Sequence, residues 1–500
     1  MPQRQTNQPP NLDDQQGRTW GQILNPVFNR KILLVPKEGR EDVENVTFSP
    51  AAQIRQTATL RRNLELRTPR KNINNVFHRI GFDDLRELHV FPTPVSDKGF
   101  FASFEHLGMA AVYSHQETDL DDVRNELEDE YEFVEDFPLS IPCRVVMSDI
   151  PSNKSKSAQD LREWPEESGV HLAHQAGVRG AGTLVGVLDT GVDADHHEFS
   201  NHRINYRYVS LQPNSPFWPP RDVRGFDTDG HGTHVCGILA GRNTGVAPEA
   251  QLYVASVIES ETILTSLTRV AAGLNWIFRQ FTRPDNEHLP AVLSMSLGFP
   301  PNLPGVSDSQ YEQRLRIMRT LLETLYQANV LPVVAIGNDG EGNYGFPGAF
   351  KDVMGIGAVD FEGNVASFSG SGTHPTEGVS KPDLVGYGVG VNSALERDYG
   401  GSAIYQRLNG TSMATPYVAG IAALYRSLYP TLTVNDLKDM LFDNALSLTG
   451  QPKKRTGAGL ARFVNQRRGR SNGVKKKGES AIKKTGGRKS RASQKSGEAG

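Results

Sequence analysis

Short apolar runs that end in a turn signature limit the fold of this chain most strongly. The run Leu184–Leu188 is followed at once by Asp189-Thr190-Gly191. A continuous apolar run of this length is typical of a strand buried on both faces, as in a parallel sheet. The carboxyl ends of such strands form the edge at which open α/β sheets bind ligands. We therefore expect Asp189 to lie at a ligand-binding edge.

A serine is predicted at the start of a buried helix. Ser412 follows Gly410-Thr411, and the apolar segment Tyr417–Leu424 comes shortly after it. Free N–H groups at a helix N-terminus can bind a developing anion. Taken alone, the segment is far more typical of an ordinary Ser/Thr-capped helix, so Ser412 needs partners before it indicates chemistry.

A candidate base for Ser412 lies upstream. A serine hydroxyl is a weak nucleophile until a base removes its proton, and that base is usually histidine. The segment Asp229–Gly237 contains His231 and His234 in what we predict to be a loop entering a buried helix. A metal pair is the alternative, although no acidic or cysteine cluster stands nearby in the sequence to complete a metal shell.

Asp189 offers the carboxylate that such a histidine needs to orient its ring. Asp-Thr-Gly is also a motif of aspartic proteases, but those need two copies and this chain has one. The order Asp189, His231, Ser412 is the order found in subtilisins, and other hydrolase folds use other orders.

With these three segments in this order, the chain resembles the subtilisin family (subtilases) of serine endopeptidases. The resemblance rests on Val187–Val192, His231–Gly237 and Gly410–Pro416, and it covers roughly residues 160–465. It implies an α/β fold, with a mainly parallel sheet and helices on both faces. It also implies peptide-bond hydrolysis through an acyl-enzyme intermediate, without a cofactor or a catalytic metal.

The resemblance extends to the oxyanion site and the substrate pocket. Asn338 follows another apolar run and takes the place of the family's oxyanion-binding asparagine, although alone it is typical of a strand-ending turn. Glu259 and Glu261 lie where a flanking binding loop is expected. They either favour a basic residue in the substrate or are ordinary solvated charges of a loop. The residues predicted to line the pocket before the scissile bond are Ser296, Leu297, Gly298, Ala335, Ile336, Gly337 and Gly345.

One departure from the family concerns calcium. The segment Gly237–Pro248, after the histidine helix, is too short for the calcium-holding loop of many secreted members. We therefore predict no metal at that place.

Composition and targeting signals favour an intracellular enzyme. The chain has 500 residues, 37% of them hydrophobic, and two cysteines, Cys143 and Cys236. We expect no structural disulfide, no membrane span and no secretory signal peptide, and therefore a cytoplasmic protein.

Four segments are expected along the chain. Residues 1–44 are predicted to be disordered, residues 45–150 to form a small α+β domain and residues 151–465 to form the catalytic domain. The α+β domain resembles a subtilase propeptide, which would make the protein a zymogen and the domain an intramolecular inhibitor. It is alternatively a permanent regulatory domain. Self-cleavage, if it occurs, is expected between Met147 and Lys156.

The last segment, residues 466–500, is a basic tail that we predict to be disordered. It holds 12 Lys and Arg residues against two acids, a net charge of +10; because the whole chain carries −3, the remainder carries −13. Such a tail suits nucleic acid, an acidic partner or the acidic body of the same chain, and it is equally typical of a solvated extension.

Three functions remain open from the sequence. They are broad protein degradation, selective processing of one partner protein in a regulatory or defence pathway, and binding by a catalytically silent protease fold. None of Asp189, His231 and Ser412 is missing, which disfavours the silent fold.

Overall fold

The computed structural model describes residues 30–37, 58, 73–84, 97–136, 138–139, 164–200, 202, 204–209, 224–260, 265–298, 307–374, 378–397 and 400–465. Within these residues, a seven-stranded sheet organises the catalytic region, and every strand pair in it is parallel. The strands, in spatial order, are β16 (Leu384–Tyr387), β13 (Met354–Val359), β12 (Val330–Ala335), β11 (Ala291–Met295), β7 (Leu184–Asp189), β9 (Gln251–Ser256) and β8 (Asn205–Tyr208).

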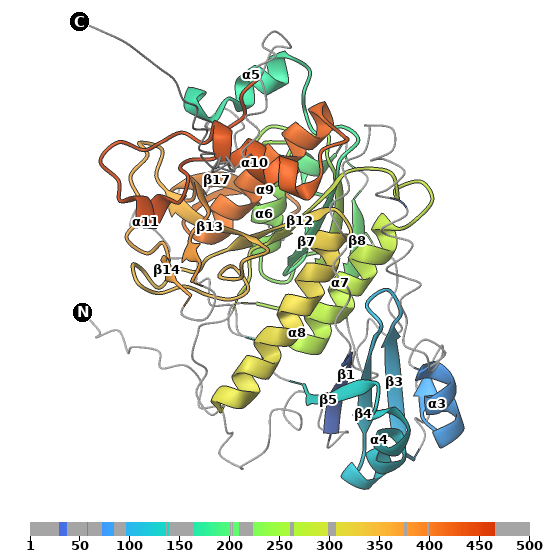
Figure 1. The fold of residues 1–500 in the computed structure, drawn as a ribbon. Coiled ribbons are helices and arrows are strands. Elements are labelled where there is room, and N and C mark those ends of the chain that lie inside the picture. Colours follow the sequence, from blue (N-terminus) through green and yellow to red (C-terminus); the bar gives the residue numbers. More distant parts are fainter. Residues whose placement is uncertain are drawn as a thin grey trace, which may run out of the picture. The chain divides into compact units, whose positions relative to one another are not determined.

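Helices cover both faces of this sheet (Figure 1). One face packs against α7 (Leu267–Phe281) and α8 (Asp308–Gln327), and the other packs against α6 (His231–Ala240) and α9 (Thr411–Leu428). Strand residues alternate between the two faces; Leu188 and Leu293, for example, join the core beneath α7, whereas Val187 joins the core beneath α9. The predicted α/β fold with helices on both faces is therefore confirmed.

The smaller elements of this region surround the sheet. They are helices α5 (Val170–Gln175), α10 (Val434–Asn444) and α11 (Lys453–Thr456), the hairpin of β17 (Val391–Leu395) and β18 (Ile404–Leu408), and the short pair β14 (Gly372–Thr373) and β15 (Ser380–Lys381). Short 3₁₀ turns lie at Glu166–Ser168 and His197–Phe199.

A second, antiparallel-rich sheet lies in the N-terminal region, with the order β2-β3-β4-β1-β5. Its elements are β1 (Arg30–Pro36), α3 (Ile73–Ile80), β2 (Asp83–Asp84), β3 (Gly99–Phe104), β4 (Met109–Ser114), the 3₁₀ turn Glu117–Leu120, α4 (Asp121–Leu127) and β5 (Tyr131–Glu135). Strands β4 and β5 and helix α4 thus lie within the segment predicted as an α+β domain.

One prediction for this region is wrong. The segment 1–44 was expected to be disordered, but its residues 30–36 form β1, which pairs with both β4 and β5. Four consecutive apolar residues, Ile32 to Val35, are buried there because alternate side chains face the two sides of the sheet. Residues 1–29 and 38–44, the predicted cleavage region, Cys143 and the basic tail lie outside the described residues.

Candidate active site

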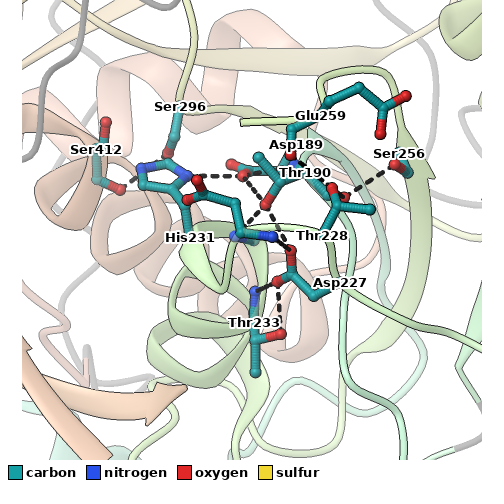
Figure 2. Close-up of polar contacts among 12 residues, drawn as sticks. Asp189, Thr190, Asp227, Thr228, His231, Thr233, Ser256, Glu259, Ser296 and Ser412 are labelled. Atoms are coloured by element: carbon teal, nitrogen blue, oxygen red, sulfur yellow. Dashed lines mark hydrogen bonds and ion pairs between the residues drawn. The ribbon is translucent and has the colours of Figure 1, made fainter. Parts of the chain in front are cut away.

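The predicted carboxylate and histidine meet at the carboxyl edge of the sheet. Asp189 is the last residue of β7, and His231 is the first residue of α6. The Nδ1–H of His231 donates to Asp189 Oδ1 over 2.7 Å, and Asp189 is fully buried. Figure 2 shows the imidazole between Asp189 on one side and Ser412 on the other. This bond fixes both the tautomer and the orientation of the ring.

Opposing effects act on the pKa of His231. Burial lowers this pKa, but the charge of Asp189 and its hydrogen bond raise it, and Asp229 and Asp227 add smaller increases, so that the pKa rises to about 9. A nearby carboxylate thus outweighs the loss of hydration. The arrangement stabilises the imidazolium form, which is the form that a histidine reaches after it accepts a proton.

Ser412 lies in the first turn of α9, immediately after Thr411. Its Oγ and the Nε2 of His231 are both buried, and neither has a hydrogen-bond partner among the residues described. Unpaired polar atoms are rare in a protein interior, and each needs an explanation. Here the two atoms are a potential proton donor and its potential acceptor, and such bonds are often long in a protein without substrate.

The carbonyl group of Ser412 has an unusual partner. Four residues further along α9, Pro416 has no N–H group and cannot donate the usual helical hydrogen bond to it. The hydroxyl of Ser296, the residue after β11, donates to Ser412 O instead, over 2.9 Å. Ser296 was predicted only as a pocket wall; its side chain also holds the turn that carries Ser412.

The amide of Asn338 has a defined orientation. Its Oδ1 accepts hydrogen bonds from both the backbone N–H and the hydroxyl of Thr411, each over 2.9 Å. Oδ1 is therefore on the side of Thr411, because only the carbonyl oxygen of the amide can accept. A Cβ built on Gly410 would lie 3.5 Å from both Asn338 Nδ2 and Ser412 N. Two N–H donors thus converge beside Ser412, an arrangement that can bind an oxyanion.

The two predicted pocket walls lie next to each other. Strands β11 and β12 are direct neighbours in the sheet, so the segments that follow them, 296–298 and 335–337, leave the same edge side by side. Gly345 lies against the second segment, where its N–H donates to Ile336 O over 2.6 Å. A Cβ on Gly337 would lie 3.3 Å from Gly345 N, so glycine keeps this approach open.

Two alternative roles can be compared with the structure. Glu259 is engaged within the protein: it forms an ion pair with Arg269 over 2.8 Å and accepts a hydrogen bond from the hydroxyl of Tyr208, whereas Glu261 lies outside the described residues. His234 bonds through Nε2 to Gln406 O, on β18, and burial lowers its pKa to about 3. In the described part of the chain, no three potential metal ligands gather.

A group of polar residues next to His231 was not predicted from the sequence. Thr190, Asp227 and Thr233 form a hydrogen-bonded cluster between the end of β7 and the start of α6 (Figure 2). The only signal in the sequence is an aspartate, Asp227, in the loop four residues before His231. Its contacts depend on how the two loops fold together.

Comparisons with known proteins agree with this geometry. The model of the Subtilase family, Peptidase_S8, matches residues 180–475. The chain is 51% identical over 371 residues to Subtilisin-like protease PopC of Myxococcus xanthus, covering 74% of this chain and 78% of that protein. It is 34% identical over 281 residues to Subtilisin Savinase of Lederbergia lenta, covering 55% of this chain and 88% of that protein.

The two relatives differ in how much they match. The alignment with the Myxococcus protein is longer than the segment matched by the family model, so it includes residues outside 180–475. No helix among the described residues is long and apolar enough to cross a membrane. The parallel sheet, the residues gathered at its carboxyl edge and the family match lead to one conclusion: the chain belongs to the subtilase family of serine peptidases.

Proposed function

We propose that this serine endopeptidase cleaves peptide bonds with Ser412 as nucleophile and His231 as general base. His231 Nε2 takes the hydroxyl proton as Oγ attacks the carbonyl carbon, and Asp189 stabilises the imidazolium that forms. His231 then returns the proton to the leaving amine, and water hydrolyses the acyl-enzyme with His231 as base again. The buried 2.7 Å bond between His231 and Asp189 carries this proposal.

Asn338 and the backbone N–H of Ser412 bind the oxyanion in this reaction. The tetrahedral intermediate carries a negative charge on the former carbonyl oxygen, and preorganised donors stabilise it. The orientation of the Asn338 amide towards Thr411 supports this role, because it leaves Nδ2 on the side of Ser412 N. Removing one such donor typically lowers kcat by about two to three powers of ten.

A fluorophosphonate probe tests the catalytic assignment directly. The wild-type protein should be labelled at Ser412, the Ser412→Ala variant should not be labelled, and Asp189→Asn should be labelled far more slowly. Asn338→Ala should lower the rate of peptide hydrolysis with little change in KM. Equal labelling of wild type and Ser412→Ala would disprove the assignment.

The N-terminal α+β domain is proposed to control access to this site. Its sheet has two apolar faces: one packs against α3 and α4 in a local core, and the other joins the hydrophobic cluster that contains α7 and α8. Phe104, Leu107 and Tyr113 of the domain belong to that shared cluster together with Leu274 and Phe278 of α7. A continuous core of this kind favours stable docking over loose tethering.

Polar contacts border this apolar interface. Asp136 accepts a hydrogen bond from Thr268 N in the first turn of α7, over 3.0 Å. Glu132 accepts two bonds from Arg316 of α8, each over 2.6 Å. The Asp136 carboxylate lies at a helix N-terminus, and Nη2 of Arg316 donates to both carboxylate oxygens of Glu132, so both contacts are charge-assisted and favour this orientation.

The last described strand of the domain supports an inhibitory role. Strand β6 (Pro138–Leu139) pairs antiparallel with β10 (Thr265–Ser266), directly before α7. Because β10 comes shortly after the predicted binding loop around Glu259, a segment paired with it can compete with a substrate strand. Purified wild-type protein should therefore lose its N-terminal domain, while Ser412→Ala should stay intact. N-terminal sequencing of both proteins tests this, and an intact, fully active wild type would contradict it.

A further inference from the structure

Asp227, in the loop before α6, accepts four hydrogen bonds through its side chain. Its Oδ1 accepts from Thr190 Oγ1 over 2.8 Å and from Asp229 N over 3.1 Å. Its Oδ2 accepts from Thr233 N over 2.7 Å and from Thr233 Oγ1 over 2.6 Å. Figure 2 shows this carboxylate between Thr190 and Thr233.

These bonds join the two segments that carry Asp189 and His231. Thr190 follows Asp189, its N–H donates to Asp189 Oδ1 over 2.8 Å, and its Oγ1 accepts from Gly232 N over 2.9 Å. Gly232 is the second residue of α6, and a Cβ there would lie 2.2 Å from Gly191 O. The start of α6 is therefore in close contact with the segment that follows β7. The Asp227 carboxylate bonds to both segments, through Thr233 and Thr190.

We propose that Asp227 is a positioning residue for peptide hydrolysis, which fixes the first turn of α6 so that the His231 ring keeps its place between Asp189 and Ser412. This inference rests on the proposed roles of those three residues. Gly230, the N-cap of α6, has no side chain to accept from the first helical N–H groups. Asp227 supplies that acceptor from three residues further upstream, and bonds to a carboxylate are stronger than neutral ones.

Glu198 provides a matched control at the other end of the same helix. It is fully buried and accepts from Asn243 N, Asn243 Nδ2, Thr244 N, Thr244 Oγ1 and the Tyr405 hydroxyl. It therefore fixes the turn after α6 as Asp227 fixes the turn before it. Asp227 is one of the groups that raise the pKa of His231, together with Asp189 and Asp229, whereas the backbone partners of Glu198 lie beyond the opposite end of α6.

The experiment compares Asp227→Asn with Glu198→Gln in the full chain. Thermal unfolding in a Ser412→Ala background measures stability without self-digestion, and both changes should lower Tm. For hydrolysis of a peptide substrate, Asp227→Asn should lower kcat by about tenfold to a hundredfold with KM changed less than about twofold. In the pH profile of kcat/KM for Asp227→Asn, the acid limb should move to lower pH, because one negative charge near the His231 imidazolium is lost. Glu198→Gln should leave kcat within about twofold and the limb unmoved.

A second pair of variants covers the case in which Asp227→Asn does not fold. Thr190→Val removes the hydroxyl that links Asp227 to Gly232, and Thr190→Ser keeps it, so only the valine variant should lose kcat. If Asp227→Asn and Glu198→Gln have equal kcat and the same pH limb, or if both Thr190 variants are equally active, Asp227 is structural only and the inference is wrong. Fluorophosphonate labelling of the wild type separates this outcome from a failure of the catalytic assignment itself.

Discussion

The hydroxyl of Ser296 should contribute to both the stability and the activity of this protein, in addition to its predicted place in a pocket wall. It is the donor to the carbonyl of Ser412 over 2.9 Å, at the place where Pro416 cannot donate. Both serines are buried, so water does not replace the lost donor in Ser296→Ala. A buried acceptor without a partner costs about 1–3 kcal/mol of folding free energy. The same change loosens the turn that carries Ser412, so kcat/KM should fall about tenfold or more.

A double-mutant cycle tests the cause of this effect. Pro416→Ala supplies a backbone N–H in the position from which a helix normally bonds to Ser412 O. In a Ser412→Ala background, which keeps that carbonyl, the loss caused by Ser296→Ala should shrink by about 1 kcal/mol when Pro416→Ala is also present. Denaturant unfolding followed by circular dichroism measures all four corners of the cycle.

Ser294→Ala is the matched control for Ser296→Ala. Ser294 lies two residues earlier on β11 and is fully buried, and its hydroxyl has no hydrogen-bond partner among the described residues. Its removal should therefore leave stability unchanged or slightly higher. The reasoning is refuted if the two serine variants lose equal stability, or if the effects of Ser296→Ala and Pro416→Ala add within about 0.5 kcal/mol.

Three further outcomes are expected. Gly232→Ala places a methyl group 2.2 Å from Gly191 O, so it should displace the start of α6 and lower kcat/KM about a hundredfold in a peptide assay. Arg316→Glu should weaken docking of the N-terminal domain by up to about 1 kcal/mol. The double variant Arg316→Glu/Glu132→Arg, which reverses the two charges, should restore docking. The activity of the uncleaved chain measures both effects. Because the pKa of His231 is raised to about 9 in the folded protein, its stabilising contribution is complete below pH 6.5 and lost as pH rises through 9, which thermal unfolding should detect.

The residues that carry the proposed chemistry were accessible from sequence because each follows a strong local pattern. Asp189 ends an apolar strand, His231 and Ser412 begin buried helices, and parallel strands bring their carboxyl ends to one edge. Asn338 needed the family resemblance, since a turn after a strand is enough to explain an asparagine. Its bonds to Thr411 appear only in the folded chain.

The supporting contacts could not be predicted in the same way. The bond from Ser296 to Ser412 joins residues 116 positions apart, and the docking bond from Arg316 to Glu132 joins residues 184 apart. Local periodicity carries no information about such pairs. Strand β1 was missed for the same reason: its partners β4 and β5 come much later in the chain, so only the assembled sheet explains why this short apolar run is ordered.

Both helices that carry the proposed reactive groups are bonded at their first turn to residues outside the helix. For α9 the partner is Ser296 at the end of β11, and for α6 it is Asp227 in the preceding loop. A first turn has free N–H groups that its own helix cannot satisfy, and in α9 Pro416 also frees one carbonyl. These groups can therefore bond to neighbouring loops and strand ends without breaking the helix. Bonds to residues at the carboxyl edge of the sheet thus hold the first turns that carry Ser412 and His231, and changes at the far ends of the helices should affect stability before they affect catalysis.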